Sequence, residues 1–308
     1  MPEPQEPQEP QEPQGSQEPQ EPPKASGAPA AEGSCDSACS SCGSECDSRT
    51  APQDRHTPLH EQSSIKHVIA VVSGKGGVGK SLATSLIVSA LHKAGLRVGI
   101  LDADITGPSI PRSFGVEEGI RPTAQGLLPA TSSSGIPFVS TNLLLPEETT
   151  PVLWRGAILS GMVQRFWAEV IWGELDYLVI DMPPGTGDIP LTVYQSLPID
   201  GVVVVTAPQD LVSMIVGKAI NMAEAMEVPV LALVENMSYF ECPSCGTTHH
   251  IFGAGRIEEL AQGYGIGLVA KIPLSPHYAQ RVDAGEVEKI EVPGFDDFIR
   301  ALIAKTGE

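Results

Sequence analysis

The chain has 308 residues, of which 41% are hydrophobic, enough to form a substantial core in one large domain or two ordinary ones. Its formal net charge of −19 argues against binding nucleic acid through charge, because phosphate backbones repel an acidic surface. The sequence contains no apolar run near the ~18 residues that span a bilayer, and its acidic, proline-rich start does not resemble a secretory signal. We therefore expect a cytoplasmic protein that binds neither nucleic acid nor membranes.

The first 64 residues differ in composition from the rest. They carry 12 acidic and 3 basic side chains, a net charge of −9. Proline, glutamine and glutamate repeat with a period of three over residues 2–13, and the pattern returns at 17–22. Proline at every third position favours extended polyproline II and supplies nothing to bury. The composition predicts a disordered arm over 1–64, followed by a folded domain over 65–308.

Short apolar runs rich in β-branched residues alternate with segments of helical periodicity after the arm. Such a run is typical of a strand that is buried on both faces. The expected strands lie at 67–72, 97–101, 177–181, 202–206 and 230–234, and the expected helices at 81–94, 158–172, 212–226 and 255–263. This alternation predicts an α/β fold with a mostly parallel sheet, helices on both faces and right-handed crossovers.

A glycine-rich loop, SGKGGVGKS at residues 73–81, joins the first expected strand to the first expected helix. It satisfies the G-x-x-x-x-G-K-[ST] pattern in the strand–loop–helix context that a P-loop requires, so the predicted α/β fold is that of a P-loop NTPase. The glycines allow backbone N–H groups to surround phosphates, Lys80 would contact the β- and γ-phosphates, and the Ser81 hydroxyl would bind Mg²⁺. The predicted ATP-binding residues of the loop are Gly74, Lys75, Gly76, Gly77, Val78, Gly79, Lys80 and Ser81.

Two acidic segments follow expected strands, at the edge where open α/β sheets bind ligands. Asp102 and Asp104 follow the strand at 97–101. Asp181 ends the strand at 177–181 and precedes the sequence MPPGTGD, so Asp181 occupies the Walker-B position. We therefore expect Asp181, through water, and Ser81 to hold the Mg²⁺ of the ATP complex.

The loop sequence GKGGVGKS resembles that of the deviant-Walker ATPases, the class that includes MinD-like, ParA-like and nitrogenase-iron-protein-like enzymes. The resemblance implies a homodimer in which Lys75 reaches the partner's phosphates. It also implies that Asp104 orients or deprotonates the attacking water while Asp102 supports the switch, and that Asn236 contacts the adenine amino group. The residues expected to act in catalysis are then Lys75, Lys80, Asp104 and Asp181.

A Cys-Pro-Ser-Cys-Gly knuckle at 242–246 presents two thiolates, Cys242 and Cys245, to one metal centre. Two thiolates cannot close a four-coordinate site alone. The other ligands could come from His249 or His250, from the N-terminal cysteines, or from the same pair in a second copy of the chain. Four thiolates across a two-fold axis would suit a [4Fe–4S] cluster or Zn²⁺, and we favour the cluster. A redox disulfide is less favoured because the knuckle follows a loop and does not open a helix.

Four segments occur in the order and spacing of the Mrp/ApbC iron–sulfur carrier ATPases, which this chain resembles over about residues 65–305. They are GKGGVGKS, the Trp154-Arg155-Gly156 triplet, DMPPGTGD and VENMSYFECPSCG. The resemblance implies a homodimeric ATPase that holds a labile [4Fe–4S] cluster at Cys242 and Cys245 and passes it to apo-proteins. It assigns no role to Arg155.

Four more cysteines, Cys35, Cys39, Cys42 and Cys46, lie within twelve residues of the arm. The last three have the C-x2-C-x3-C spacing of ferredoxin-type clusters. Some eukaryotic relatives of the family carry an N-terminal ferredoxin-like cluster, but with wider spacings than these. A second iron–sulfur cluster, a zinc ion and unmetallated thiols are therefore all open for this segment.

Two other functions compete with that of a cluster carrier. A spatial regulator of the MinD or ParA type would need a basic amphipathic C-terminal helix or a basic DNA-facing patch. Residues 294–305 instead combine five apolar side chains with two acids and two bases, which predicts a helix packed on its own core. A zinc-stabilised ATPase without cluster chemistry is the other alternative. We favour an ATP-hydrolysing carrier.

Overall fold

The computed structural model describes residues 56–104, 110–116, 118–140, 143, 156–208 and 212–307. The chain divides into two units, Met1–Gln53 and Asp54–Glu308, and every described residue belongs to the second. The predicted disorder of residues 1–55 and the metal chemistry of the arm cysteines lie outside the described residues and stay predictions.

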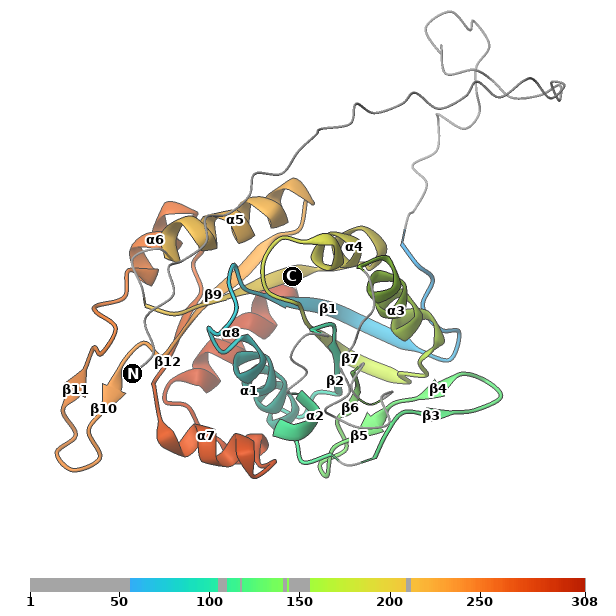
Figure 1. Cartoon of the computed structure of the whole chain (residues 1–308), viewed down its shortest axis with the longest axis horizontal. Helices are drawn as coiled ribbons and strands as arrows, with labels where there is room; N and C mark the ends of the chain where they lie inside the picture. Colours follow the sequence, from blue (N-terminus) through green and yellow to red (C-terminus); the bar gives the residue numbers. More distant parts are fainter. Residues whose placement is uncertain are drawn as a thin grey trace, which may run out of the picture. The chain divides into compact units, whose positions relative to one another are not determined.

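An eight-stranded sheet forms the centre of the folded unit (Figure 1). Seven strands are parallel, and only β5 at one edge runs antiparallel to its neighbour. Across the sheet the order is β12 (Val269–Ile272), β9 (Val230–Asn236), β8 (Gly201–Thr206), β1 (Ser64–Val72), β7 (Glu174–Asp181), β2 (Val98–Asp102), β6 (Pro137–Ser140) and β5 (Ala130–Thr131). The mostly parallel α/β architecture is as predicted.

Helices cover both faces of this sheet (Figure 1). One face carries α1 (Lys80–Lys93), α2 (Ile110–Ser113), α7 (Pro276–Asp283) and α8 (Phe295–Thr306). The other carries α3 (Gly156–Glu169), α4 (Asp188–Ser196), α5 (Val212–Ala225) and α6 (Ile257–Gly263). Two small hairpins, β3 (Arg121–Pro122) with β4 (Leu127–Leu128) and β10 (Phe240–Glu241) with β11 (Thr248–His249), lie outside the main sheet, and a 3₁₀ turn spans Val287–Lys289.

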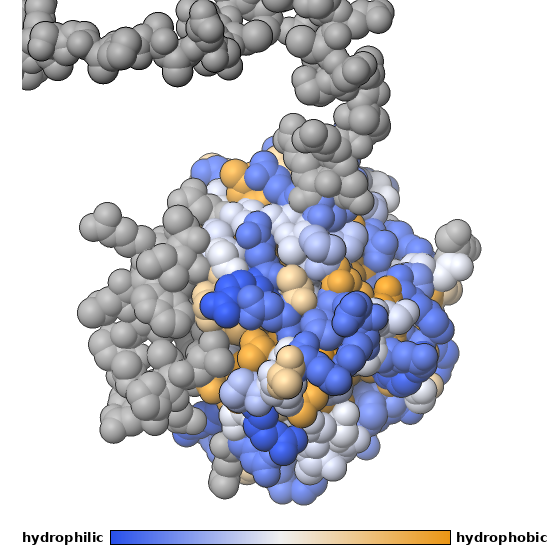
Figure 2. Space-filling view, turned by 90° about the vertical axis from the view of Figure 1, so that its right-hand side faces the viewer, coloured by the Kyte–Doolittle hydropathy of each residue, from blue (hydrophilic) through white to orange (hydrophobic). Residues whose placement is uncertain are grey.

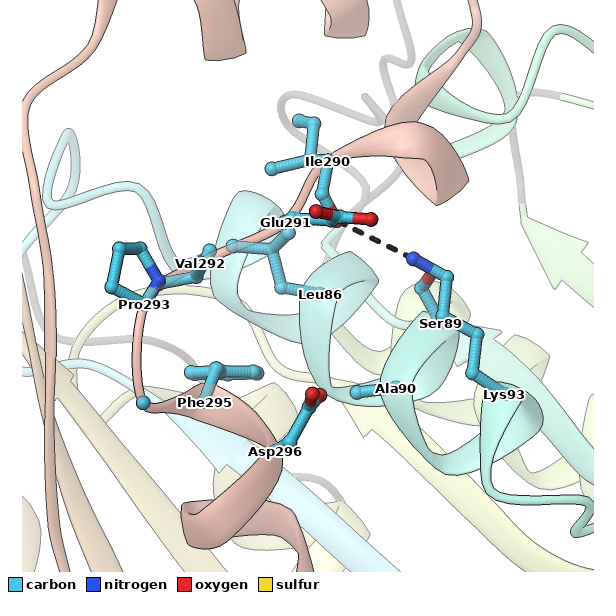
Figure 3. A pocket seen from close by; sticks show the side chains of 11 residues that line it. Leu86, Ser89, Ala90, Lys93, Ile290, Glu291, Val292, Pro293, Phe295 and Asp296 are labelled. Atoms are coloured by element: carbon cyan, nitrogen blue, oxygen red, sulfur yellow. Dashed lines mark hydrogen bonds between the residues drawn. The ribbon is translucent and has the colours of Figure 1, made fainter.

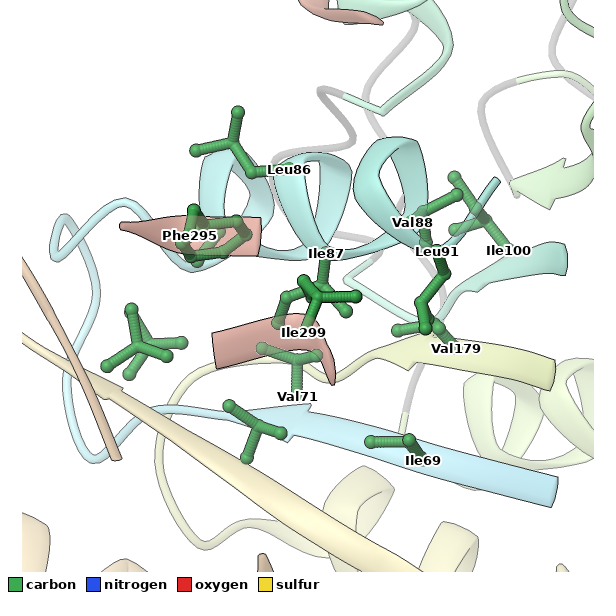
Figure 4. Close-up of a cluster of buried hydrophobic side chains, with 14 of the residues drawn as sticks. Ile69, Val71, Leu86, Ile87, Val88, Leu91, Ile100, Val179, Phe295 and Ile299 are labelled. Atoms are coloured by element: carbon green, nitrogen blue, oxygen red, sulfur yellow. The ribbon is translucent and has the colours of Figure 1, made fainter. Parts of the chain in front are cut away.

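The central strand β1 explains why an uninterrupted apolar run lies in the middle of the fold. Successive side chains of a strand point to opposite faces. Ile69 and Val71 pack with the helices α1 and α8, whereas Val68 and Ala70 pack on the other face. Both sets are buried because helices cover both faces. Figure 4 shows the first face, where side chains of α1 and α8 lie over the strand.

The C-terminal helix α8 packs on the core, as predicted. Phe295, Phe298, Ile299 and Leu302 are buried in the same hydrophobic cluster as the inner face of α1. A cavity of about 470 Å³ lies between the second half of α1 and residues 290–296 (Figure 3). Lys93 reaches across it and donates to the Ile290 carbonyl at 3.5 Å. Of the helices within the described residues, none has the length and apolarity that crossing a membrane requires.

Residues 56–63 precede the predicted domain boundary at residue 65 and already contact the folded unit. The Thr57 amide donates to the Ser196 carbonyl at 2.7 Å, and the Trp167 indole donates to the Thr57 carbonyl at 2.8 Å. These contacts use backbone groups, so hydropathy does not reveal them.

Figure 2 shows the side of the molecule that carries the β3–β4 hairpin, where hydrophobic residues lie in small separate groups among hydrophilic ones.

Candidate functional site

The P-loop joins β1 to α1 at the carboxyl edge of the parallel strands. Val72 ends β1, Lys80 begins α1, and Gly79 caps the helix in a left-handed conformation with φ 80°. The loop borders a cavity of about 450 Å³. A helix N-terminus and glycine N–H groups around such a cavity are the arrangement that binds phosphate. The remaining walls come from other elements, among them Asp104, Ser113, Pro184 and Val282.

Two glycines of the loop occupy positions where no side chain fits. A Cβ at Gly74 would lie 2.4 Å from the Ile215 carbonyl oxygen in α5, and a Cβ at Gly79 would lie 2.0 Å from Asn236 Nδ2. Helix α5 and the end of β9 can approach the loop this closely only because both residues lack a side chain. The loop is thereby held between two elements that lie far along the chain.

Lys80 is buried between two carboxylates, with 5% of its side chain exposed. Its Nζ lies 2.8 Å from Asp181 Oδ1 and 3.3 Å from Asp104 Oδ2. The two carboxylates therefore hold the ammonium as ion pairs. A buried ammonium at the border of such a cavity is suited to phosphate oxygens, with which it can form charge-assisted hydrogen bonds.

Asp181 ends β7, fully buried, and binds two hydroxyl groups of α1. Ser81 Oγ donates to its Oδ2 and Thr84 Oγ1 donates to its Oδ1, each at 2.7 Å. The adjacent oxygens of Ser81 and Asp181 fit Mg²⁺, a hard cation that takes oxygen ligands and keeps several waters. The sequence analysis missed Thr84, although its place one turn after Ser81 puts both on the same side of α1.

Asp102 faces Asp181 across the adjacent strands β2 and β7. Only 1% of Asp102 is exposed, and its Oδ1 accepts the Asp104 amide at 3.1 Å. Burial raises the pKa of Asp102 well above its usual value and the charge of Asp181 raises it further, whereas Ser140 and Lys80 act in the opposite direction. Asp104 lines the cavity, and its predicted action on the attacking water stays a prediction.

Of two more predicted nucleotide-binding residues, one lies within the loop and one beside it. Lys75 is half-buried, and the Ser73 hydroxyl donates to its carbonyl at 3.0 Å. Asn236 is buried at the end of β9, where its Nδ2 donates to the Val78 carbonyl at 3.0 Å. Asn236 therefore holds the P-loop in this structure. The predicted contacts of Lys75 with a partner's phosphates and of Asn236 with adenine stay predictions.

Cys242 and Cys245 lie in the turn of the β10–β11 hairpin. The Cys242 amide donates to the Thr247 carbonyl at 3.0 Å, and the Gly246 amide donates to the Cys242 carbonyl at 2.8 Å. Gly246 has φ 69°, a left-handed conformation that favours glycine. This tight turn leaves Cys242 half-buried and Cys245 exposed.

The described residues provide this thiol pair with no third ligand. Among them, no His, Cys, Asp or Glu joins the two cysteines in a metal-binding group. His250 instead donates from Nδ1 to the Ser238 carbonyl at 3.3 Å. The hydrogen bond between Cys245 and the Thr247 hydroxyl, at 3.2 Å, lowers the pKa of the Cys245 thiol and favours the metal-binding thiolate. The predicted binding of a metal centre by this pair stays a prediction.

A comparison with protein families matches residues 64–301 to the ParA family model described as NUBPL iron-transfer P-loop NTPase. This chain belongs to that family. Two curated relatives of this NUBPL-type protein are named iron-sulfur cluster carrier protein. The one from Methanocaldococcus jannaschii is 43% identical over 262 residues, which cover 82% of this chain and 89% of the relative. The one from Saccharolobus solfataricus is 45% identical over 228 residues, which cover 73% and 77%.

Solved structures agree with this assignment of the NUBPL-type chain. A nucleotide-binding protein from Archaeoglobus fulgidus in complex with ADP is 45% identical with a TM-score of 0.69, and the match covers 76% of this chain and 92% of that one. The MinD cell division protein of Aquifex aeolicus has a TM-score of 0.52 at 20% identity, covering 79% and 98%, so this likeness concerns the fold alone. The predicted family and P-loop NTPase fold are confirmed.

Some residues singled out in the sequence lie outside the described residues of this NUBPL-type protein. They are Arg155 and the arm cysteines Cys35, Cys39, Cys42 and Cys46. The possible second metal site of the arm therefore stays a prediction.

Proposed function

We propose that this protein is a cytoplasmic, ATP-hydrolysing carrier that receives a [4Fe–4S] cluster at Cys242 and Cys245 and delivers it to apo-proteins. The observation that carries the proposal is the presence, in one folded unit, of a P-loop and a thiol pair, half-buried at Cys242 and exposed at Cys245, without a third ligand among the described residues. A structural metal site is closed by its own ligands. An incomplete, exposed site suits cargo that must leave again, and the names of the relatives support this interpretation.

In the nucleotide site, this chain's residues bind and orient ATP. Lys80 would turn from its two carboxylates to the β- and γ-phosphates, and the P-loop amides would surround them. Ser81 and Asp181 would hold Mg²⁺, which neutralises charge on the phosphates when it is bound. Asp104 would orient or deprotonate the attacking water. Lys75 would reach the phosphates of a second copy, so hydrolysis would require a homodimer.

The cluster is cargo that needs four thiolates. A second copy of the chain supplies the missing two if the hairpins meet across a two-fold axis. The predicted contact of Lys75 with the phosphates of a partner also requires a dimer. A spatial regulator is disfavoured, because α8 uses its apolar residues for the core of its own unit. A zinc-stabilised ATPase differs from a carrier in a directly measurable way, through its metal.

Anaerobic reconstitution of the full chain with iron and sulfide tests the proposal. The protein should bind about four iron and four sulfide per dimer, with the brown colour of a cluster. A full-length variant with all four arm cysteines replaced by serine should keep this content, and Cys242→Ser/Cys245→Ser should lose it in that background. If the six-serine variant bound as much iron, the proposed site would be wrong. A colourless, zinc-rich native preparation would favour the zinc-stabilised ATPase.

A further inference from the structure

The turn at residues 235–238, which comprises the last two residues of β9 and the two that follow it, connects the nucleotide site to the cysteine hairpin. At its start, Asn236 donates to the Val78 carbonyl at 3.0 Å and lies so close to the P-loop that Gly79 cannot carry a Cβ. Two residues later, the backbone carbonyl of Ser238 accepts a hydrogen bond from His250 Nδ1 at 3.3 Å. Ser238 precedes β10 and His250 follows β11, so this contact closes the base of the hairpin that carries both cysteines. One turn therefore contacts both sites.

Ser238 is held from several sides and is 2% exposed. Its amide donates to the Ile272 carbonyl of β12 at 3.0 Å, and its hydroxyl donates to Glu235 Oε2 at 2.5 Å. Glu235 is itself 2% exposed, and a Cβ at Gly255 would lie 2.2 Å from its Oε1. The serine hydroxyl therefore holds the turn to a buried carboxylate and does not face the solvent.

Met237, between the two contact residues, has φ 57°, a left-handed conformation that is costly for a residue with a side chain. Such conformations cost about 1–3 kcal/mol, and they persist only where the surrounding contacts hold them. The contacts here are those of Asn236 and Ser238. Loosening either one would therefore remove a contact that holds the turn in this conformation.

We propose that the turn at residues 235–238 couples the two sites, so that nucleotide in the P-loop and a cluster at Cys242 and Cys245 strengthen each other's binding, with Ser238 as the positioning residue. The inference rests on the proposed function for the identity of the two ligands. A bound nucleotide fixes the P-loop and with it Asn236 and the turn. The hairpin base is then already ordered when the cluster binds, so less conformational entropy is lost. Because coupling is reciprocal, a bound cluster must tighten nucleotide binding by the same factor.

Calorimetric titration with Mg²⁺·ADP of the full chain, metal-free and anaerobically cluster-loaded, measures the coupling. The loaded protein should bind ADP at least fivefold more tightly, at the low end of typical couplings. Ser238→Ala should keep its iron content and its ADP affinity in the metal-free state. The ratio of the ADP affinities of loaded and metal-free protein should fall below about twofold. Ser275→Ala is the matched control. Ser275 is the residue before α7, and its side chain makes no cap hydrogen bond to that helix. It should keep the wild-type ratio.

Equal ADP affinities of loaded and metal-free wild-type protein, or an unchanged ratio in Ser238→Ala, would overturn the coupling while leaving the proposed function intact. A protein that bound no cluster at Cys242 and Cys245 would instead refute the proposed function. If Ser238→Ala failed to fold, hydrogen exchange of metal-free wild-type protein decides. Mg²⁺·ADP should slow exchange at the amides of Ser238 and Cys242, and unchanged exchange there would contradict the inference.

Discussion

Asp181 illustrates how a single buried carboxylate organises the nucleotide site. It accepts hydrogen bonds from Ser81 and Thr84 and lies 2.8 Å from the Lys80 ammonium. Ser81 and Lys80 border the cavity at the P-loop, and in the proposed function they turn to Mg²⁺ and phosphate when ATP binds. Thr84 is fully buried one turn further along α1. We therefore interpret Thr84 as the partner that keeps the carboxylate oriented in both states.

Replacing Thr84 with valine should destabilise the protein. Valine has the same shape but removes the hydrogen bond to Asp181 Oδ1, leaving a buried carboxylate oxygen with one partner fewer. Such a loss costs about 1–3 kcal/mol in the free energy of unfolding. Urea denaturation of the nucleotide-free protein measures it. Thr84→Ser keeps the hydroxyl but removes a buried methyl group, so it should lose less stability than Thr84→Val; equal losses in the two variants would show that packing, and not the hydrogen bond, matters here.

Replacing Asp102 with asparagine should raise the thermal midpoint at neutral pH. Burial and the neighbouring Asp181 raise the pKa of Asp102 in the folded state above its ordinary value of 3.8. The stability that this group contributes is complete below that value and is lost as pH rises through the folded-state pKa. Asparagine resembles the neutral acid and can still accept the Asp104 amide. The advantage of the variant should therefore shrink as the pH falls toward 4.

Asp176→Asn is the control of opposite sign for that experiment. Hydrogen bonds from Arg97 and Lys66 lower the pKa of Asp176, so its ionised form stabilises the fold above its ordinary pKa. This variant should be less stable than wild type at neutral pH, and the deficit should shrink on acidification. A lower midpoint for Asp102→Asn at pH 7 would contradict our assignment of a destabilising buried charge.

At the scale of elements, the sequence predicts what local patterns encode. The apolar runs at 67–72 and 177–181 became β1 and β7, because strands covered on both faces must be apolar throughout. The elements α4, α7 and β12 were missed, being only nine, eight and four residues long without a clear apolar stripe. The Asn236–Val78 hydrogen bond joins residues 158 positions apart, so no local pattern indicates it. The P-loop was recognised from its spacing, whereas the turn that holds it was not.

The contact between α5 and the P-loop gives a test at this scale. Gly74→Ala would place a Cβ 2.4 Å from the Ile215 carbonyl, so either the loop or the helix must move. We expect a loss of about 1–3 kcal/mol in unfolding free energy, typical of overpacking, together with weaker ADP binding. Gly76→Ala is the matched control for stability, because a Cβ there meets only Pro184 Cγ at 3.9 Å. Equal stabilities of the two variants would show that α5 does not constrain the loop.

At the scale of the whole molecule, charge opposes the proposed dimer. Each copy carries a formal net charge of −19, of which residues 1–64 contribute −9. Like charges of this size repel at low ionic strength and are screened within about 10 Å at 0.1 M salt. The arm cysteines could also complete the thiol pair within one chain. The association state therefore distinguishes a shared centre from a centre closed by the arm.

Sedimentation of the anaerobically reconstituted full chain should show a dimer that returns to a monomer when a chelator removes the iron. The dimer should strengthen as salt rises from about 0.01 M to 0.15 M, because screening reduces the repulsion between two acidic copies. Lys75→Ala should keep this cluster-dependent dimer but lose the association that ATP promotes in metal-free protein. Lys218→Ala removes an exposed lysine of α5 and is the matched control. A monomer that holds a full cluster would mean that the arm cysteines close the site, and the shared centre would have to be abandoned.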